Sequence, residues 1–204
     1  MVKAYADKIT SYLIKRETIK DEEFEIYSYG FETLIAFIVN IVAILTVGYM
    51  LDRFIETLIF LCFYCPIRQF SGGFHAENYR RCLLVFITLY LYNTYFLYKI
   101  IHNNKTVLMI VITIISYIGI IYLSPQEHRN NPLSNEERKK YKKIVIHISS
   151  FLLFLSFMGI NYTVTYEYAM YASSVIVCIF IMLILGIIKK GVSKLWKKAK
   201  AQYY

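Results

Sequence analysis

Charged residues, proline and cysteine are all scarce in this chain of 204 residues. Asp, Glu, Lys and Arg make up 18% of it, against about 25% in soluble domains, and hydrophobic residues make up 57%, against about 45–50%. A chain this apolar cannot remain disordered. Its four cysteines are too few, over this length, for a disulfide-bonded miniprotein. The length corresponds to a single domain, and the grouping of the apolar residues argues against a soluble one.

Long windows without Asp, Glu, Lys or Arg hold most of the hydrophobic residues. A helix needs about 20 apolar residues to cross a bilayer. The window Cys82–Tyr98 continues through Lys99 to Ile101, because a lysine at a helix end can reach the interface. A sixth window, Phe54–Phe70, contains Glu56 and Pro66, and we expect a short or tilted span that ends near the proline. The five clear windows are Thr33–Leu51, Cys82–Tyr98, Thr106–Ser124, Ile144–Tyr166 and Tyr168–Ile188.

The distribution of Lys and Arg predicts how six spans are oriented. With both termini inside, 20 of the 23 basic residues fall on the inner side, as the positive-inside rule requires. We therefore predict an all-α integral membrane protein, a six-span helical bundle with cytoplasmic N- and C-termini. Its single domain would comprise an N-terminal segment (1–27), the bundle (28–188) and a basic tail (189–204). A re-entrant second span would put the ends on opposite sides, which the charges disfavour. The first 26 residues lack the apolar core of a signal peptide, so we expect the first span to be an uncleaved anchor.

The N-terminal segment Val2–Ile19 mixes apolar and charged residues at roughly helical spacing. We expect an amphipathic interfacial helix on the inner leaflet, although a solvated helix packed on the bundle fits the same pattern. The predicted inner side carries 20 basic and ten acidic residues. This surplus suits anionic lipids or an acidic peptide as partners, although positive-inside bias alone also explains each basic cluster. We expect no nucleic-acid partner, because the basic residues are split among short segments beside the membrane.

The connection between the second and third predicted spans, Cys65–Cys82, concentrates residue types that the chain otherwise uses little. Gly72 and Gly73 permit positive φ and close backbone approach, although an ordinary turn needs no more than this pair. His75 and Cys82 suggest a thiol nucleophile and its base, because imidazole can take a thiol proton near neutral pH. Cys82 also begins a span, and a helix N-terminus favours a thiolate and a developing oxyanion.

The spacing of the two residues limits how they can meet. In one straight helix the Cα atoms of His75 and Cys82 would lie about 10.5 Å apart, too far for a direct hydrogen bond. We therefore predict that His75 lies in the glycine turn, or in a broken first helical turn, and folds back toward Cys82. Glu32, Glu77 or Asn78 are candidates to orient the imidazole, and the sequence does not choose among them.

Other readings of this segment stay open at this point. Cys62-x2-Cys65, together with the histidine and the cysteine above, has a zinc-ligand spacing. The first two cysteines lie in an apolar run, however, where a thiol usually packs as a small hydrophobe, so we expect neither a metal nor a cofactor. Arg68 can bind a substrate carboxylate bidentately or pair with Glu77, or it can simply anchor the helix end at the interface.

The pattern Arg68-x4-Gly73-x-His75-x6-Cys82, between the second and third spans of a six-span chain of this length, resembles the AgrB family, accessory gene regulator B. The stretch Ser124–Ser134, followed by a Lys-rich run, is similar to the family's inner loop between spans 4 and 5. The resemblance covers nearly the whole chain. It implies that Cys82 is the nucleophile and His75 its base, and that Arg68 and Gly73 match positions needed for activity or folding.

The resemblance also implies an activity, a location and partners. Members of the family are multi-pass cysteine endopeptidases of the bacterial cell membrane, with the active site at the cytoplasmic side, and are thought to be homodimers. They cut the C-terminal tail from a short precursor peptide of the AgrD type and form a thiolactone quorum-sensing signal. The alternative is a small multispan peptide or solute transporter without protease activity, but midspan polar residues are few and no internal repeat is found. A structural membrane subunit is a third reading.

Overall fold

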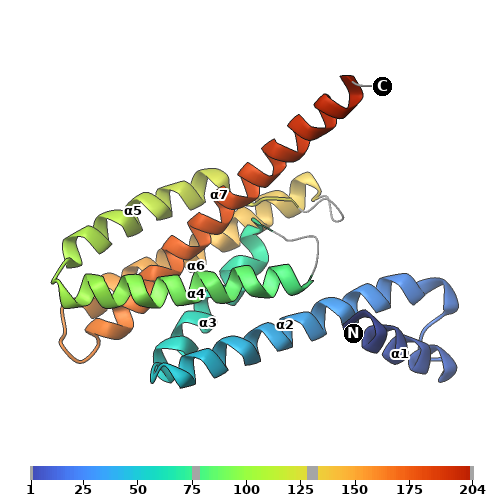
Figure 1. The fold of residues 1–204 in the computed structure, drawn as a ribbon, viewed down its shortest axis with the longest axis horizontal. Coiled ribbons are helices and arrows are strands. Elements are labelled where there is room, and N and C mark those ends of the chain that lie inside the picture. The colour runs from blue at the N-terminus through green and yellow to red at the C-terminus, as the bar shows by residue number, and fades with distance from the viewer. Residues whose placement is uncertain (1, 75–78, 128–132, 203–204) are drawn as a thin grey trace. The chain divides into compact units, whose positions relative to one another are not determined.

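The structure is a computed structural model that describes residues 2–74, 79–127 and 133–202, with the backbone alone for Tyr79 and for residues 193–202. Every regular element in the described part of the chain is a helix (Figure 1), so the all-helical fold class is confirmed. The chain divides into two compact units, residues 1–51 and 52–204.

The first unit pairs a short helix with a long apolar one. It consists of α1 (Val2–Lys15), a short 3-10 helix η1 (Asp21–Glu23) and α2 (Phe24–Met50). Ala6 and Thr10 are fully buried where α1 packs on α2. The Ser28 hydroxyl of α2 donates a 2.5 Å hydrogen bond to the Asp7 carboxylate of α1. A charged residue of the amphipathic segment therefore helps to fix the two helices together.

The apolar face of α1 is left uncovered within this unit. Tyr5 and Tyr12 are 62% and 57% exposed, because the small Ala6 and Thr10 lie on the side that meets α2. The predicted helix over Val2–Ile19 is too long, since α1 ends at Lys15 and Glu17 follows with φ +55°. An exposed apolar face is what an interfacial helix needs, and the interfacial location itself stays a prediction.

The second unit is built around its last helix. It contains α3 (Phe54–Ser71), α4 (Tyr79–His102), α5 (Thr106–Leu123), α6 (Asn135–Ile160) and α7 (Tyr166–Gln202). Each of the first four contacts α7. In α7, 61% of the apolar window is buried, whereas the buried share is 22–28% in α4, α5 and α6. Figure 1 shows α7 passing among the other helices of this unit and continuing beyond them. The core of the unit therefore lies along α7.

Five helical segments of the described chain are long and apolar enough to cross a membrane. They are residues 21–50, 80–102, 106–123, 135–160 and 166–192. Many of their large apolar side chains are exposed, such as Val107 at 74% and Tyr122 at 79%, as expected where lipid covers the outer surface. The chain is thus consistent with a membrane protein. Helix α3, the expected sixth span, contains Glu56 and Arg68 and is not among the five.

Two helix boundaries differ from the sequence-based expectation. The second predicted span does not end near Pro66, because α3 continues to Ser71. The proline removes one backbone hydrogen bond, but Tyr64 and Ile67 on either side of it are buried and hold the helix in place. Helix α6 begins at Asn135, nine residues before the predicted start at Ile144. Its start is a capping box, in which Ser134 and Glu137 each accept a hydrogen bond from the other's backbone N–H.

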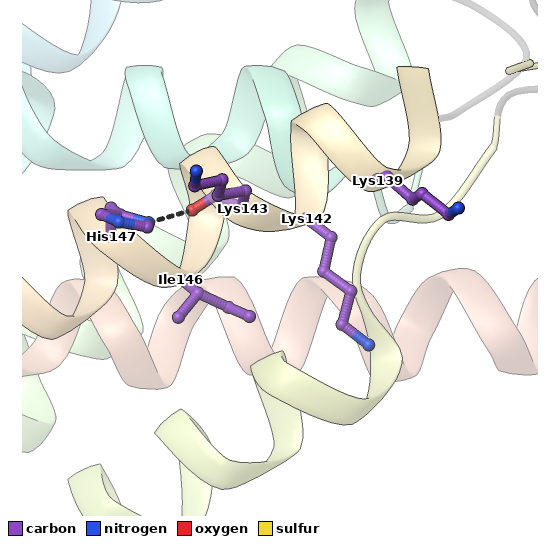
Figure 2. A pocket seen from close by; sticks show the side chains of 5 residues that line it. All are labelled: Lys139, Lys142, Lys143, Ile146 and His147. Carbon is purple, nitrogen blue, oxygen red and sulfur yellow. Dashed lines mark hydrogen bonds between the residues drawn. The ribbon is translucent and has the colours of Figure 1, made fainter. Parts of the chain in front are cut away.

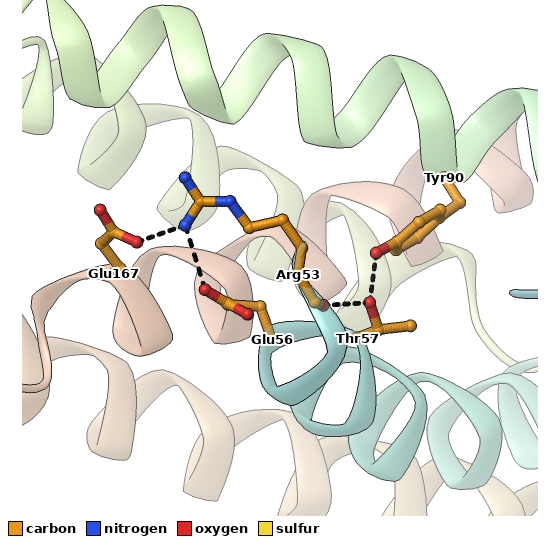
Figure 3. Close-up of polar contacts among 5 residues, drawn as sticks. All are labelled: Arg53, Glu56, Thr57, Tyr90 and Glu167. Carbon is orange, nitrogen blue, oxygen red and sulfur yellow. Dashed lines mark hydrogen bonds and ion pairs between the residues drawn. The ribbon is translucent and has the colours of Figure 1, made fainter. Parts of the chain in front are cut away.

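An ionic network ties the beginning of α3 to the beginning of α7 (Figure 3). Arg53, which precedes α3, donates hydrogen bonds to Glu56 at 3.1 Å and to Glu167 of α7 at 2.6 Å. The hydrogen bond to Glu56 raises the pKa of the Arg53 guanidinium above its ordinary value. The hydroxyls of Thr57 and Tyr90 share a 2.5 Å hydrogen bond beside it. This network fixes one end of α3, and the candidate site lies at the other end.

Candidate functional site

A turn of two glycines follows the C-terminal end of α3. The Gly72 N–H donates to the Arg68 carbonyl and closes the helix, and Gly72 and Gly73 then adopt φ of +67° and +117°. A Cβ on Gly72 would run into the carbonyl oxygen of Gln126, and one on Gly73 would lie 2.9 Å from the carbonyl oxygen of Met182. The positive φ and the close backbone approach that the glycine pair predicts are therefore both present.

The turn is held on α7 and on the loop that follows α5. The Phe74 N–H donates to the Met182 carbonyl of α7 at 2.8 Å, and the Gln126 N–H donates to the Ser71 carbonyl at 2.8 Å. The Gln126 side-chain amide also donates to the Leu183 carbonyl of α7 at 2.8 Å. The end of α3, the loop and α7 are thus joined by three hydrogen bonds.

Arg68 lies against this turn. Its Nη2 donates a hydrogen bond to the Phe74 carbonyl, while Nη1 is buried and has no partner among the described residues. A Cβ on Gly73 would overlap Nη1, so the glycine also makes room for the guanidinium. The Arg68 guanidinium therefore holds Phe74, the residue that immediately precedes His75 in the sequence.

Cys82 lies in the first turn of α4, where its thiol is free and half-buried. Tyr64 of α3 stacks on Phe86, one helical turn after Cys82, with ring centroids 5.0 Å apart. The buried ring of Tyr64 therefore packs the second half of α3 against the first turns of α4.

Several predicted site residues cannot be placed. His75, Glu77 and Asn78 lie outside the described residues, so the predicted return of His75 toward Cys82 stays a prediction. Glu32 is half-buried in α2 and belongs to the first unit.

The remaining cysteines do not gather into a cluster in the described part of the chain. Cys62 is exposed, Cys65 is half-buried and Cys178 is buried in α7. No group of three or more His, Cys, Asp or Glu side chains there is arranged to hold a metal ion. The zinc reading also requires His75, which is outside the described residues.

An open hollow of about 290 Å³ lies on α6, in its lysine-rich first half (Figure 2). Lys139, Lys142, Lys143, Ile146 and His147 line it. Nδ1 of His147 is 2.7 Å from the Lys143 carbonyl, one helical turn earlier. Three cationic side chains around an apolar floor form a surface that suits an amphipathic anion.

Sequence reasoning did not identify several residues that build the site. Gln126 and Met182 hold the turn through hydrogen bonds, and Gly186 of α7 faces the same turn. Gln126 falls in the Ser124–Ser134 stretch that resembles a family loop, which is a usable signal. Gly186 gives a weaker one, because a glycine inside an apolar helix often marks close packing.

Comparisons with known sequences point to one family. The sequence profile of the accessory gene regulator B family matches residues 6–189. A putative AgrB-like protein 2 from Clostridium perfringens (strain 13) is 29% identical over 164 residues, covering 78% of this chain and 75% of that protein. Accessory gene regulator protein B from Staphylococcus aureus (strain MW2) is 28% identical over 151 residues, covering 73% and 80% respectively. No solved structure matches. Because the family profile matches most of its length, the chain belongs to the accessory gene regulator B family.

Proposed function

We propose that this protein is a membrane cysteine endopeptidase that removes the C-terminal tail of a short AgrD-type precursor peptide and cyclises the remainder to a thiolactone signal. The observation that carries the proposal is a free, half-buried thiol at Cys82, in the first turn of α4, in a family member whose glycine turn leads directly to His75. Family membership supports the quorum-sensing role.

The first chemical step is acyl transfer to the enzyme. The Cys82 thiol gives its proton to His75, and the thiolate attacks the carbonyl carbon of the scissile peptide bond. As the tetrahedral intermediate collapses, the C–N bond breaks and the imidazolium returns its proton to the leaving amine. The tail departs with a free N-terminus, and the remainder of the peptide is bound to Cys82 as a thioester. The N-terminal amides of α4 are suited to stabilise the developing oxyanion.

The second step closes the ring. The thiol of a cysteine within the bound peptide loses its proton and attacks the Cys82 thioester. One thioester forms as another breaks, so bond energy is roughly conserved and Cys82 regains its proton. The protein then needs only to hold the peptide thiol close to the thioester and to exclude water, which would otherwise hydrolyse it.

Arg68 and the lysine hollow are suited to hold the substrate. One guanidinium nitrogen of Arg68 fixes the turn, and the buried Nη1 keeps a donor for an acceptor on the peptide or for Glu77. The hollow formed by Lys139, Lys142 and Lys143 is suited to an acidic peptide tail. Anionic lipids would compete for the same charges. A homodimer remains part of the proposal, on the family resemblance alone.

We also propose that α3 crosses the membrane as the second of six spans, with both termini and the active site at the cytoplasmic side of a bacterial cell membrane. Arg53 ties the start of α3 to the start of α7, and Phe74 ties the end of α3 to Met182. The two helices therefore run in the same direction over about 23 Å, the rise of α7 from Glu167 to Met182. Spans 2 and 6 of a six-span protein must run in the same direction, which supports this topology.

Peptide cleavage by the purified protein in liposomes tests the proposal. The substrate is a synthetic AgrD-type precursor with an internal cysteine and an acidic tail, and neither nucleotide nor ion gradient is supplied. We expect tail release by the wild type and by Cys62→Ala, and none by Cys82→Ala. A substrate whose internal cysteine is replaced by alanine should leave its acyl group on Cys82, visible as a mass adduct. Cleavage that survives Cys82→Ala, or transport without cleavage, would overturn the proposal.

A further inference from the structure

The turn that leads to His75 rests on a glycine of α7. A Cβ on Gly186 would lie 2.8 Å from the carbonyl carbon of Gly73 and 2.9 Å from the amide nitrogen of Phe74. Ordinary van der Waals contact with a Cβ begins at 3.4 Å. Any side chain at position 186 would therefore push the turn away from α7. One helical turn earlier, Met182 accepts the hydrogen bond from Phe74. The turn therefore packs directly against α7 at Gly186.

Gln126 occupies the same point from the other side. Its Oε1 would also overlap a Cβ on Gly186, so the carboxamide and the backbone of residues 73–74 share the space left by the missing side chain. Its Nε2 is committed to the Leu183 carbonyl, which fixes the plane of the amide. Oε1 is buried and has no partner among the described residues. The side chain therefore locks the loop to α7 immediately beside the turn.

Another glycine of α7 shows that this arrangement is local. Gly191 lies five residues later in the same helix, and nothing would lie within 4 Å of a Cβ there. Alanine favours a helix over glycine by about the same amount at both positions. The two glycines thus differ in what their missing side chains allow, and only Gly186 has the turn against it.

We propose that Gly186 is a positioning residue of the active site, assisted by Gln126. Through this glycine, α7 sets the backbone position of residues 73–74, from which the chain continues to His75. The inference rests on the proposed function, since it assigns His75 as the base for Cys82. Phe74 immediately precedes His75 in the sequence, so a displaced turn changes the backbone position from which the chain continues to His75. A methyl at position 186 requires a shift of about half an ångström or more. Proton transfer needs hydrogen-bond geometry, and a misplacement of about 1 Å can cost about 100-fold in rate.

Comparing Gly186→Ala with Gly191→Ala tests the inference on the full-length protein in liposomes. We expect Gly186→Ala to lower the rate of peptide cleavage by about tenfold or more, chiefly in kcat, while Gly191→Ala stays within about twofold of wild type. With Cys82 as the sole cysteine, the pH midpoint of its alkylation should move in Gly186→Ala toward that of His75→Ala. A purely structural role would lower thermal stability and leave this midpoint unchanged.

A second variant covers the case in which Gly186→Ala does not fold. Gln126→Met keeps the length of the side chain, removes the bond to Leu183 and leaves the backbone bond to Ser71 intact. It should lower cleavage and shift the alkylation midpoint in the same direction, by less. Equal kinetics and equal midpoints for Gly186→Ala and Gly191→Ala would overturn the inference, as would an unshifted midpoint in Gln126→Met. Peptide cleavage that continues when Cys82 is replaced by alanine would instead reject the proposed function.

Discussion

The Arg68 guanidinium donates a hydrogen bond to the Phe74 carbonyl, so a side chain from the end of α3 holds the residue that precedes His75. The same residue is held on its other side, where the Phe74 N–H donates to Met182 of α7. A backbone fixed at both its N–H and its carbonyl has little freedom to rotate. The spacing of Arg68, Gly73 and His75 thus has a physical cause, because the arginine reaches over a glycine to the backbone ahead of the histidine.

Arg68→Lys should impair activity although it keeps the positive charge. A lysine has a single nitrogen and cannot both hold the Phe74 carbonyl and present a second donor where Nη1 lies. Losing a charge-assisted hydrogen bond costs about 1.5–3 kcal/mol, so we expect peptide cleavage to fall about tenfold or more. Arg81→Lys, at an exposed position of α4, is the matched control. Full activity of Arg68→Lys would show that the arginine only anchors the helix end.

Gly73→Ala should reduce both stability and cleavage. Its φ of +117° is unfavourable for alanine, and the new Cβ would meet the Met182 carbonyl oxygen at 2.9 Å and overlap the Arg68 guanidinium. We expect a loss of about 1–3 kcal/mol in stability and a larger loss of cleavage, measured by thermal unfolding in detergent and by tail release. Gly30→Ala, where nothing lies within 4 Å of a Cβ, should change neither. Normal cleavage by Gly73→Ala would contradict the described turn.

The ionic network at the other end of α3 should contribute to stability and not to catalysis. The Glu56 side chain is 11% exposed, against 47% for Glu167, so removing Arg53 leaves a mostly buried carboxylate unpaired. We expect Arg53→Gln to lower the free energy of unfolding by about 1–3 kcal/mol and Glu167→Gln by less than about 1 kcal/mol. In both variants the rate at which Cys82 is alkylated should depend on pH as it does in the wild type. If Glu167→Gln lowers the free energy of unfolding more than Arg53→Gln does, the buried Glu56 is not the carboxylate that depends most on Arg53.

Reversing the charge of the lysine hollow should weaken substrate binding. The triple variant Lys139→Glu, Lys142→Glu and Lys143→Glu should raise KM for an acidic-tailed peptide by about tenfold or more and leave kcat within about twofold. Lys140→Glu is the single-site control, because Lys140 does not line the hollow. A substrate with a neutral tail should show little difference among the variants. An unchanged KM for the acidic substrate would remove the hollow from the account.

The spans were predictable because lipid leaves a strong mark on sequence. Windows without charged residues located both ends of α4 and α5 and the start of α7 within a few residues, whereas α6 ends six residues before its window does and α7 continues 14 residues beyond its own. The start of α6 was missed although its signal was present, since Ser134 and Glu137 have the spacing of a capping box. Pro66 led to the wrong prediction that the second span ends there. The helix continues because burial of Tyr64 and Ile67 against neighbouring helices outweighs one missing hydrogen bond.

The site was only partly predictable. The Gly72–Gly73 pair by itself predicts an unusual turn. Arg68 was a candidate because its guanidinium can bind a carboxylate bidentately, and the structure shows it bound to the Phe74 carbonyl. Nothing local in the sequence places Gly186 beside Gly73, because 113 residues separate them along the chain and only the packing of α7 brings them together. The same is true of Gln126, whose contacts are with Ser71 and Leu183.

The rate at which Cys82 is alkylated, measured against pH in membranes, tests the central claim most directly. The other three cysteines are replaced, and wild-type His75 is compared with His75→Ala. A free thiol shows a midpoint near about 8.5. The account predicts a midpoint well below that value, which rises when His75 is removed. A midpoint at or above the value of a free thiol, and indifferent to His75, would contradict a resting Cys82–His75 pair.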